Sequence, residues 1–479
     1  MGVLSNLEPQ AVFDFFEEIS AIPHGSGNTR EISDYLVRFA EARQLQYHRD
    51  ELGNVIIKKA ASKGYEDKEA IMLQGHVDMV AVKKPGSKID LEKEGLKLRV
   101  EGDNLFAEDT SLGGDDGIAV AYELALLDAD GLKHPPLECV FTVDEEIGLI
   151  GAGAIDLSCC RAKRMINLDS EDEGVFLAGC AGGMRVDCRL PLEREEVQGI
   201  SCLITIGGLR GGHSGVEIHK ERGNSNVLAG RFLLYVKQKL RFRILEINGG
   251  LADNAIPRET KLRLVVADIF ALEAAAEEFD RMIKQELQTK DPEVFCRFEM
   301  LKPGTFCTVT WEDSQKAAAF IGCMPAGVQA NSAEVKGLVE TSLNMGLMSS
   351  SDKELVLGFS LRSSYEGAKE GLKNQLFALT EGLGGSASFT GNYPGWAYRK
   401  DSPLRETMVR IYEEMYNKKA IVEAIHAGLE CGFFVGKIPE LDCVSIGPDM
   451  QNIHTTEETM SISSVARTWE FLCRVLEEV

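Results

Sequence analysis

Five side chains in this sequence have the types and positions that a pair of divalent metal ions requires. Imidazole nitrogens and carboxylate oxygens form a ligand set that suits two zinc ions, and one carboxylate can bridge both. Each residue alone is also compatible with an ordinary role, such as a helix cap or a loop residue. Together they predict a metal site formed by His76, Asp115, Glu146, Asp169 and His454.

Asp78 lies two residues after His76, in the segment Gly75-His76-Val77-Asp78. A histidine at the end of a strand can offer one ring nitrogen to a metal ion. A nearby carboxylate can hold the other nitrogen and so fix the tautomer and the ring orientation. We therefore predict that Asp78 orients His76.

Three acids in a row, Asp144-Glu145-Glu146, follow an apolar segment. Such a run is often a solvated turn, but here it follows residues 137–143, which read as a buried strand. Neighbouring side chains of an extended chain point in opposite directions. We therefore expect one glutamate to bind metal and the other, Glu145, to remain free to transfer a proton.

The elements that must position these residues are short apolar strands that alternate with helices. Such alternation predicts an α/β sheet, and ligands in such folds gather beyond the carboxyl ends of the strands. The helix predicted over 116–128 is apolar nearly all round, as expected of a helix buried against a sheet. The predicted strands that precede candidate residues cover 70–73, 137–143, 165–168 and 444–446.

Composition excludes several other classes of protein. A net charge of −23 opposes binding to nucleic acid or to an anionic membrane. No apolar run approaches the roughly 20 residues of a membrane span, and the N-terminus lacks the features of a signal peptide. The 12 cysteines show no CxxC pairs, so we expect free thiols in the reducing cytoplasm.

The length predicts more than one domain, and the pattern changes character near residue 187. Longer alternating strands and helices follow, as in an α+β unit, and the first style returns after 392. We therefore expect a discontinuous metal-binding domain, 1–186 and 392–479, with a domain of residues 187–391 inserted. A central mixed sheet flanked by helices is expected in the former.

These motifs resemble those of the dizinc peptidase family that includes aminoacylases, peptidase T and glutamate-releasing carboxypeptidases. Within it, the aminoacyl-histidine dipeptidases are the most similar group. The resemblance covers nearly the whole chain. Beyond the metal motifs it rests on five segments: Gly179–Gly183, Gly211–Gly215, Asn254–Arg258, Tyr393–Trp396 and Ile425–Gly432. One departure is Asp116, where the family pattern has asparagine.

The resemblance implies a role for each metal-site residue. His76 and Asp169 would complete one metal site, Glu146 and His454 the other, and Asp115 would bridge them. Glu145 would be the general base of a cytosolic dipeptidase that hydrolyses Xaa-His or β-alanyl-histidine-like dipeptides. Manganese or cobalt could replace the two zinc ions, because such ligands accept all three.

The inserted domain resembles the family's lid, with hinges near 187 and 391 and an interface for a homodimer. A lid that serves its own chain is the alternative, so His213 acts either within one chain or across a dimer. The glycines around His213 favour a donor to the oxyanion, the alternative being a turn histidine. Candidates for substrate binding are Arg362, which suits a carboxylate, and Asn254, His426 and Gly428.

Two other functions remain compatible with the sequence. The same site could remove acyl groups from amino acids or act on tripeptides. A non-catalytic metal-binding or scaffolding protein is a third interpretation, and it predicts that a ligand or the base is missing. All of these residues are present in this chain.

Overall fold

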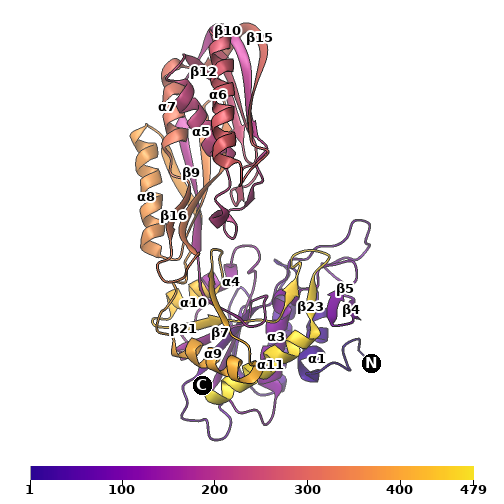
Figure 1. Ribbon diagram of the computed structural model, residues 1–479. Coiled ribbons are helices and arrows are strands. Elements are labelled where there is room, and N and C mark those ends of the chain that lie inside the picture. Colours follow the sequence, from indigo (N-terminus) through magenta and orange to yellow (C-terminus); the bar gives the residue numbers. More distant parts are fainter. Residues whose placement is uncertain (1) are drawn as a thin grey trace. The chain divides into compact units, whose positions relative to one another are not determined.

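The computed structural model describes residues 2–479, and the chain divides into two compact units. Unit 1 contains the N-terminal residues up to Cys180 together with Trp396–Ala424 and Leu429–Val479. Unit 2 contains Ala181–Gly395 and Ile425–Gly428. Figure 1 shows the helices and strands of both units.

Unit 1 is built on a mixed sheet. The strands β3, β6 and β7 run parallel to one another, β21 runs parallel to β7, and β1 and β2 pair antiparallel at one edge. The sheet contains, in spatial order, β1 (Gln46–Arg49), β2 (Val55–Lys59), β6 (Leu137–Thr142), β3 (Ile71–His76), β7 (Arg164–Asn167), β21 (Asp442–Ser445), β8 (Val175–Cys180) and β20 (Ile421–Ile425).

Most helices of unit 1 share one apolar core with the strands of this sheet. The helix α3 is the extreme case, since residues 114–127 are all buried, as its sequence predicts. In Figure 1, α9 and α11 lie beside one another. The helices are α1 (Gln10–Ser20), α2 (Arg30–Ala42), α3 (Gly114–Asp128), α4 (Ile150–Ala154), α9 (Pro403–Tyr416), α10 (Cys431–Lys437) and α11 (Ile462–Glu478).

A small antiparallel sheet in unit 1 joins the last part of the chain to residues near 100. It places the segment that carries His454 beside the start of α3. It contains β22 (Met450–Gln451), β23 (Thr459–Ser461), β5 (Asn104–Ala107) and β4 (Leu98–Glu101).

Unit 2 is an α+β unit with an antiparallel sheet. Figure 1 shows α5 (Ser225–Val236), α6 (Ile269–Leu287), α7 (Trp311–Cys323) and α8 (Glu366–Gly382) along its strands. The strands are, in spatial order, β15 (Phe295–Val309), β10 (Arg194–Gly207), β14 (Thr260–Val266), β12 (Phe242–Gly249), β17 (Val339–Ser350), β18 (Glu354–Ser363), β9 (Gly182–Pro191) and β19 (Ser386–Tyr393), with β16 (Gly327–Asn331) on β17. A separate pair joins β11 (Gly212–His213) to β13 (Ala255–Ile256).

The α/β class with an additional α+β unit is the fold that the sequence predicts, although the unit boundaries differ from those expected at 186/187 and 391/392. The strand β9 crosses the first of these positions and β19 the second. Both strands pair within the sheet of unit 2. Ile425–Gly428 also belongs to unit 2, which no local pattern indicates.

Two further findings concern the described residues, 2–479. None of their helices is long and apolar enough to cross a membrane. All 12 cysteines are free thiols, as expected.

Candidate metal centre and active site

Asp115 lies between two histidines in unit 1. Its Oδ1 is 3.0 Å from Nε2 of His76, and its Oδ2 is 2.9 Å from Nε2 of His454. A ligand pair separated by about 3 Å is compatible with one ion bound at about 2 Å from each atom. One oxygen toward each histidine is the arrangement that a bridging carboxylate requires.

The other predicted ligands lie next to the same two histidines. Oδ1 of Asp169 is 3.7 Å from Nε2 of His76, and Oε1 of Glu146 is 2.7 Å from Nε2 of His454. The nitrogen and oxygen atoms form three groups, each within 4.8 Å: His76 with Asp116 and Asp169, His76 with Glu145 and Glu146, and Asp115 with Glu146 and His454. The donor chemistry and the spacing fit two divalent ions.

The fold explains why residues so distant in sequence meet. His76 is the last residue of β3, Asp169 follows β7, and Glu145 and Glu146 follow β6. These three strands are parallel neighbours, so their carboxyl ends share one edge of the sheet. Asp115 arrives from the start of α3, and His454 from the loop between β22 and β23.

Asp78 contacts His76 on the side of the ring opposite Asp115, and Ser26 supports Asp78. Nδ1 of His76 is 2.9 Å from the backbone oxygen of Asp78 and 3.5 Å from its Oδ1, and Ser26 donates a hydrogen bond to Oδ2 of Asp78. Burial alone would lower the pKa of His76, but the hydrogen bonds to Asp115 and Asp78 raise it well above its usual value. These contacts fix the ring so that Nε2 faces Asp115.

Glu145, the predicted general base, is a carboxyl with little access to solvent. Burial raises its pKa to about 8. Its backbone N–H donates to Oδ1 of Asp78 at 2.9 Å. Cations bound beside it would favour the charged carboxylate and so lower this pKa, which a general base requires.

The strand alternation expected for the two glutamates is wrong. Asp144 has a φ of 55°, so the chain leaves the extended conformation before Glu145. The carboxylates of Glu145 and Glu146 therefore both reach the vicinity of His76. Asp144 also accepts a hydrogen bond from the backbone of Gly27, which fixes this turn.

Two further acids near the site have no local sequence pattern that identifies them. Asp116, which the metal prediction leaves out, accepts the backbone N–H of His76 on Oδ2, and its Oδ1 is buried without a partner in the described part of the chain. Burial raises the pKa of Asp116 well above its usual value. The other acid is Glu458, four residues after His454, and that proximity is the only signal in the sequence.

Glu458 holds the loop that presents Asp115. Its carboxylate accepts the backbone N–H groups of Leu112, Gly113 and Gly114 at 2.8, 3.1 and 2.9 Å. Gly113 has a φ of 67°, a conformation that glycine adopts without strain. Three charge-assisted hydrogen bonds therefore fix the entry into α3.

Replacing Glu458 by alanine is expected to lower the free energy of unfolding by about 2 kcal/mol, because three buried N–H groups lose their acceptor. Urea unfolding of the purified variant measures the change. Glu457→Ala is the matched control, since Glu457 pairs with Lys84 at the surface. Equal stability of the two variants would contradict this role for Glu458.

The predicted oxyanion and substrate residues lie in unit 2. His213 is in β11 and pairs with Ala255, the neighbour of Asn254. Gly215 and Val216 donate their backbone N–H groups to Nδ1 of His213 at 3.3 Å. Nδ1 therefore carries the lone pair and Nε2 the proton. Burial lowers the pKa of this histidine, so it is a neutral donor.

Arg362 is a buried cation near two neutral histidines. Its guanidinium donates to the hydroxyl of Tyr393 at 3.0 Å, and no carboxylate of residues 2–479 forms an ion pair with it. Burial, then the charge of Arg362, lowers the pKa of His426 to about 3, and Nε2 of His426 contacts Oγ of Ser342 at 2.7 Å. A Cβ at Gly428 would meet the Tyr393 ring at 2.8 Å, so glycine is required there.

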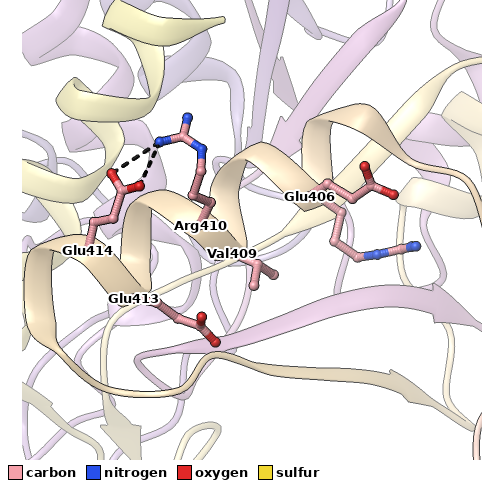
Figure 2. Close-up of a pocket in the computed structure, with 6 residues that line it drawn as sticks. Glu406, Val409, Arg410, Glu413 and Glu414 are labelled. Carbon is pink, nitrogen blue, oxygen red and sulfur yellow. Dashed lines mark hydrogen bonds and ion pairs between the residues drawn. The ribbon is translucent and has the colours of Figure 1, made fainter.

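Two hollows of unit 1 differ in chemistry. One of about 740 Å³ is lined by Glu146 and by Ser26, Met79, Leu91 and Ile147, which leaves space beside a candidate ligand. Figure 2 shows the other, of about 530 Å³, on α9. Charged side chains such as the Arg410–Glu414 ion pair line it, and none of the candidate metal or catalytic residues does.

Comparison with known proteins identifies the family. Residues 72–478 match the model described as Peptidase family M20/M25/M40. The chain belongs to this peptidase family. It is therefore a hydrolase, as the sequence predicts, and the family together with the three ligand groups supports the binding of metal ions.

Similar proteins of this peptidase family extend over the full chain. A cytosol non-specific dipeptidase of Escherichia coli (strain K12) is 35% identical over 483 residues, which cover 100% of this chain and 99% of the relative. The crystal structure of an aminoacylhistidine dipeptidase from Vibrio alginolyticus has a TM-score of 0.95 at 33% identity, covering 100% of this chain and 98% of that one. A tripeptidase structure from Staphylococcus aureus, with a TM-score of 0.56 at 16% identity, shares the fold.

Proposed function

We propose that this peptidase is a cytosolic dipeptidase that uses two zinc ions held by His76, Asp115, Glu146, Asp169 and His454. The observation that carries the proposal is the position of Asp115, with one carboxylate oxygen toward each of two histidines. Full-length similarity to two proteins named as dipeptidases supports the substrate class. The cytosolic relative and the free thiols support the compartment.

The chemistry proposed for the site is hydrolysis with a water nucleophile. Bound divalent cations would polarise the scissile carbonyl and lower the pKa of water. Glu145 takes a proton from the attacking water and gives it to the leaving amine. Asp78 keeps the His76 ring in place during these steps.

His213 is proposed to stabilise the oxyanion. Its Nδ1 accepts two backbone N–H groups, which leaves Nε2–H as a donor at any pH near neutrality. A fixed neutral donor interacts most strongly where negative charge develops in the transition state. Sedimentation shows whether a homodimer forms. Activity recovered on mixing His213→Ala with Glu145→Gln would show that this donor acts across a homodimer through unit 2, and no recovery would show action within one chain.

Arg362 is proposed to bind the carboxylate of the dipeptide, with Asn254, His426 and Gly428 as further contacts. A guanidinium without an ion-pair partner among the described residues is suited to bind an anion in a bidentate manner. The low pKa of His426 keeps that side chain neutral beside it. The charge of the guanidinium is therefore available for a substrate carboxylate.

Arg362→Met is expected to lower kcat/KM for dipeptides roughly 10- to 100-fold, mainly through KM, because a charge-assisted contact of about 1.5–3 kcal/mol is lost. Steady-state kinetics with Gly-His measures the effect. Arg189→Met is the control, because Arg189 forms a surface ion pair with Glu354 in the same sheet. A dipeptide KM unchanged in Arg362→Met would refute carboxylate binding by this residue.

A substrate panel tests the function itself. With β-Ala-His, Gly-His, Gly-Leu, N-acetyl amino acids and tripeptides, we expect hydrolysis of the dipeptides and preference for those that end in histidine. Preference for acetylated substrates would instead show an aminoacylase, and cleavage of the longer peptides a tripeptidase. Metal analysis of the same preparation identifies the ion, with manganese and cobalt as the alternatives to zinc.

A further inference from the structure

A layer of polar side chains lies directly beneath the metal-site residues of unit 1. Gln74, Thr142 and Asn167 belong to the neighbouring strands β3, β6 and β7 and have no exposed surface. Gln74 stands two residues before His76 in β3, so both point to the same face of the sheet, and Asn167 is the last residue of β7, two residues before Asp169. Gln74 is also in register with Asn167, and His76 with Thr142.

Glu430 connects the three strands through hydrogen bonds to this layer. Its Oε2 accepts a hydrogen bond from Nε2 of Gln74 at 2.5 Å and from Oγ1 of Thr142 at 2.6 Å. Gln74 in turn accepts one from Nδ2 of Asn167 at 2.7 Å and donates one to Thr142 at 3.2 Å. One carboxylate thus links the strands that end in the candidate metal ligands.

Burying these polar side chains in the interior of a sheet has a cost in free energy. Glu430 is fully buried, and neither its Oε1 nor Oδ1 of Asn167 has a hydrogen-bond partner among residues 2–479. A buried, partly satisfied polar network stabilises a fold less than apolar side chains of the same volume would. Stability alone therefore does not account for a carboxylate at this place.

We propose that Glu430 is a positioning residue that fixes the metal ligands by tying together the ends of β3, β6 and β7 through Gln74 and Thr142. The hydrogen-bonding geometry is what matters, because Oε2 can accept both bonds whether or not Oε1 carries a proton. Residues that orient metal ligands typically change metal affinity or activity 10- to 100-fold when replaced. The inference rests on the proposed metal site.

Cobalt binding to the purified full-length protein tests the role. Glu430→Met removes the acceptor at similar length, and we expect the Co²⁺ dissociation constant to rise at least roughly tenfold with a changed visible absorption spectrum of the bound ion. Glu430→Gln keeps an acceptor oxygen and should restore affinity and spectrum to within about twofold of the unmodified protein. In Glu430→Met, the loss of Co²⁺ affinity should be accompanied by a lower kcat and an unchanged KM.

Thr142→Val gives a second route if Glu430→Met does not fold. It removes one donor to Glu430 with little change in volume and should weaken Co²⁺ binding roughly tenfold. Thr380→Val is the control, because Thr380 is a buried threonine of unit 2 whose hydroxyl donates to the backbone of Leu376.

The outcomes separate this inference from the proposed function. Unaltered Co²⁺ affinity and spectrum in Thr142→Val and in folded Glu430→Met, whatever the melting temperature, would show that Glu430 only contributes to folding. Equal damage in Glu430→Gln and Glu430→Met would exclude the acceptor role. If the unmodified protein bound no Co²⁺, the proposed metal site itself would be wrong.

Discussion

Glu145→Gln is expected to lower kcat by about 10²–10⁴-fold, the usual contribution of a general base, while the metal content stays unchanged. Glutamine keeps the volume of the side chain and its backbone N–H contact with Asp78 but cannot accept the proton. Two candidate groups are complete without Glu145, namely Asp115 with Glu146 and His454, and His76 with Asp116 and Asp169, although Glu145 also lies near His76. The loss should therefore appear in turnover and not in metal binding.

Steady-state kinetics and metal analysis on one preparation of each protein measure this effect. Glu51→Gln is a suitable control, because Glu51 is an exposed glutamate outside the site. Full activity in Glu145→Gln would show that another group accepts the proton. Loss of metal together with activity would instead make Glu145 a ligand, which its proximity to His76 makes a real alternative.

Asp115→Ala should have the second large effect, because this carboxylate contacts both histidines. We expect loss of both ions and a fall in activity beyond the roughly 10- to 100-fold typical of outer partners. Metal-free unmodified protein, prepared with a chelator, should show the same inactivity and should recover when zinc is restored. The variant should not recover.

The control for this experiment is Asp103→Ala. Asp103 accepts hydrogen bonds from Ser461 and Ser463 at the protein surface, so its loss should leave metal content and activity intact. Retention of two ions per chain in Asp115→Ala would exclude the bridging role. Full activity of chelator-treated protein would exclude metal-dependent hydrolysis altogether.

Local hydrophobic patterns were sufficient to predict the elements that present the site. The strands β3, β6 and β7 and the buried helix α3 are visible as apolar runs, and polar residues at their ends stand out against them. The same reasoning fails where the backbone departs from regular geometry. Asp144 takes a left-handed conformation, and that single residue turns both following glutamates toward one cluster.

Residues whose hydrogen-bond partners are distant in sequence could not be identified from local patterns. Glu458 meets Gly113 across 345 positions, and Glu430 meets Gln74 across 356. Each looks like an ordinary acid in its own segment, because the N–H groups and amides that it binds are supplied by other elements. The boundaries between the units also depend on residues that are distant in sequence. The strand β9 joins the sheet of unit 2 through its pairing with β18 and β19.

The return of the chain to unit 1 at Leu429 has a consequence for biosynthesis. His454 is synthesised 339 residues after Asp115, and Glu458, which secures the Gly113 loop, follows it. Until both have emerged from the ribosome, a nascent chain contains only part of the proposed metal site. Hydrolytic activity should therefore appear only after this late segment has been made and has folded onto unit 1.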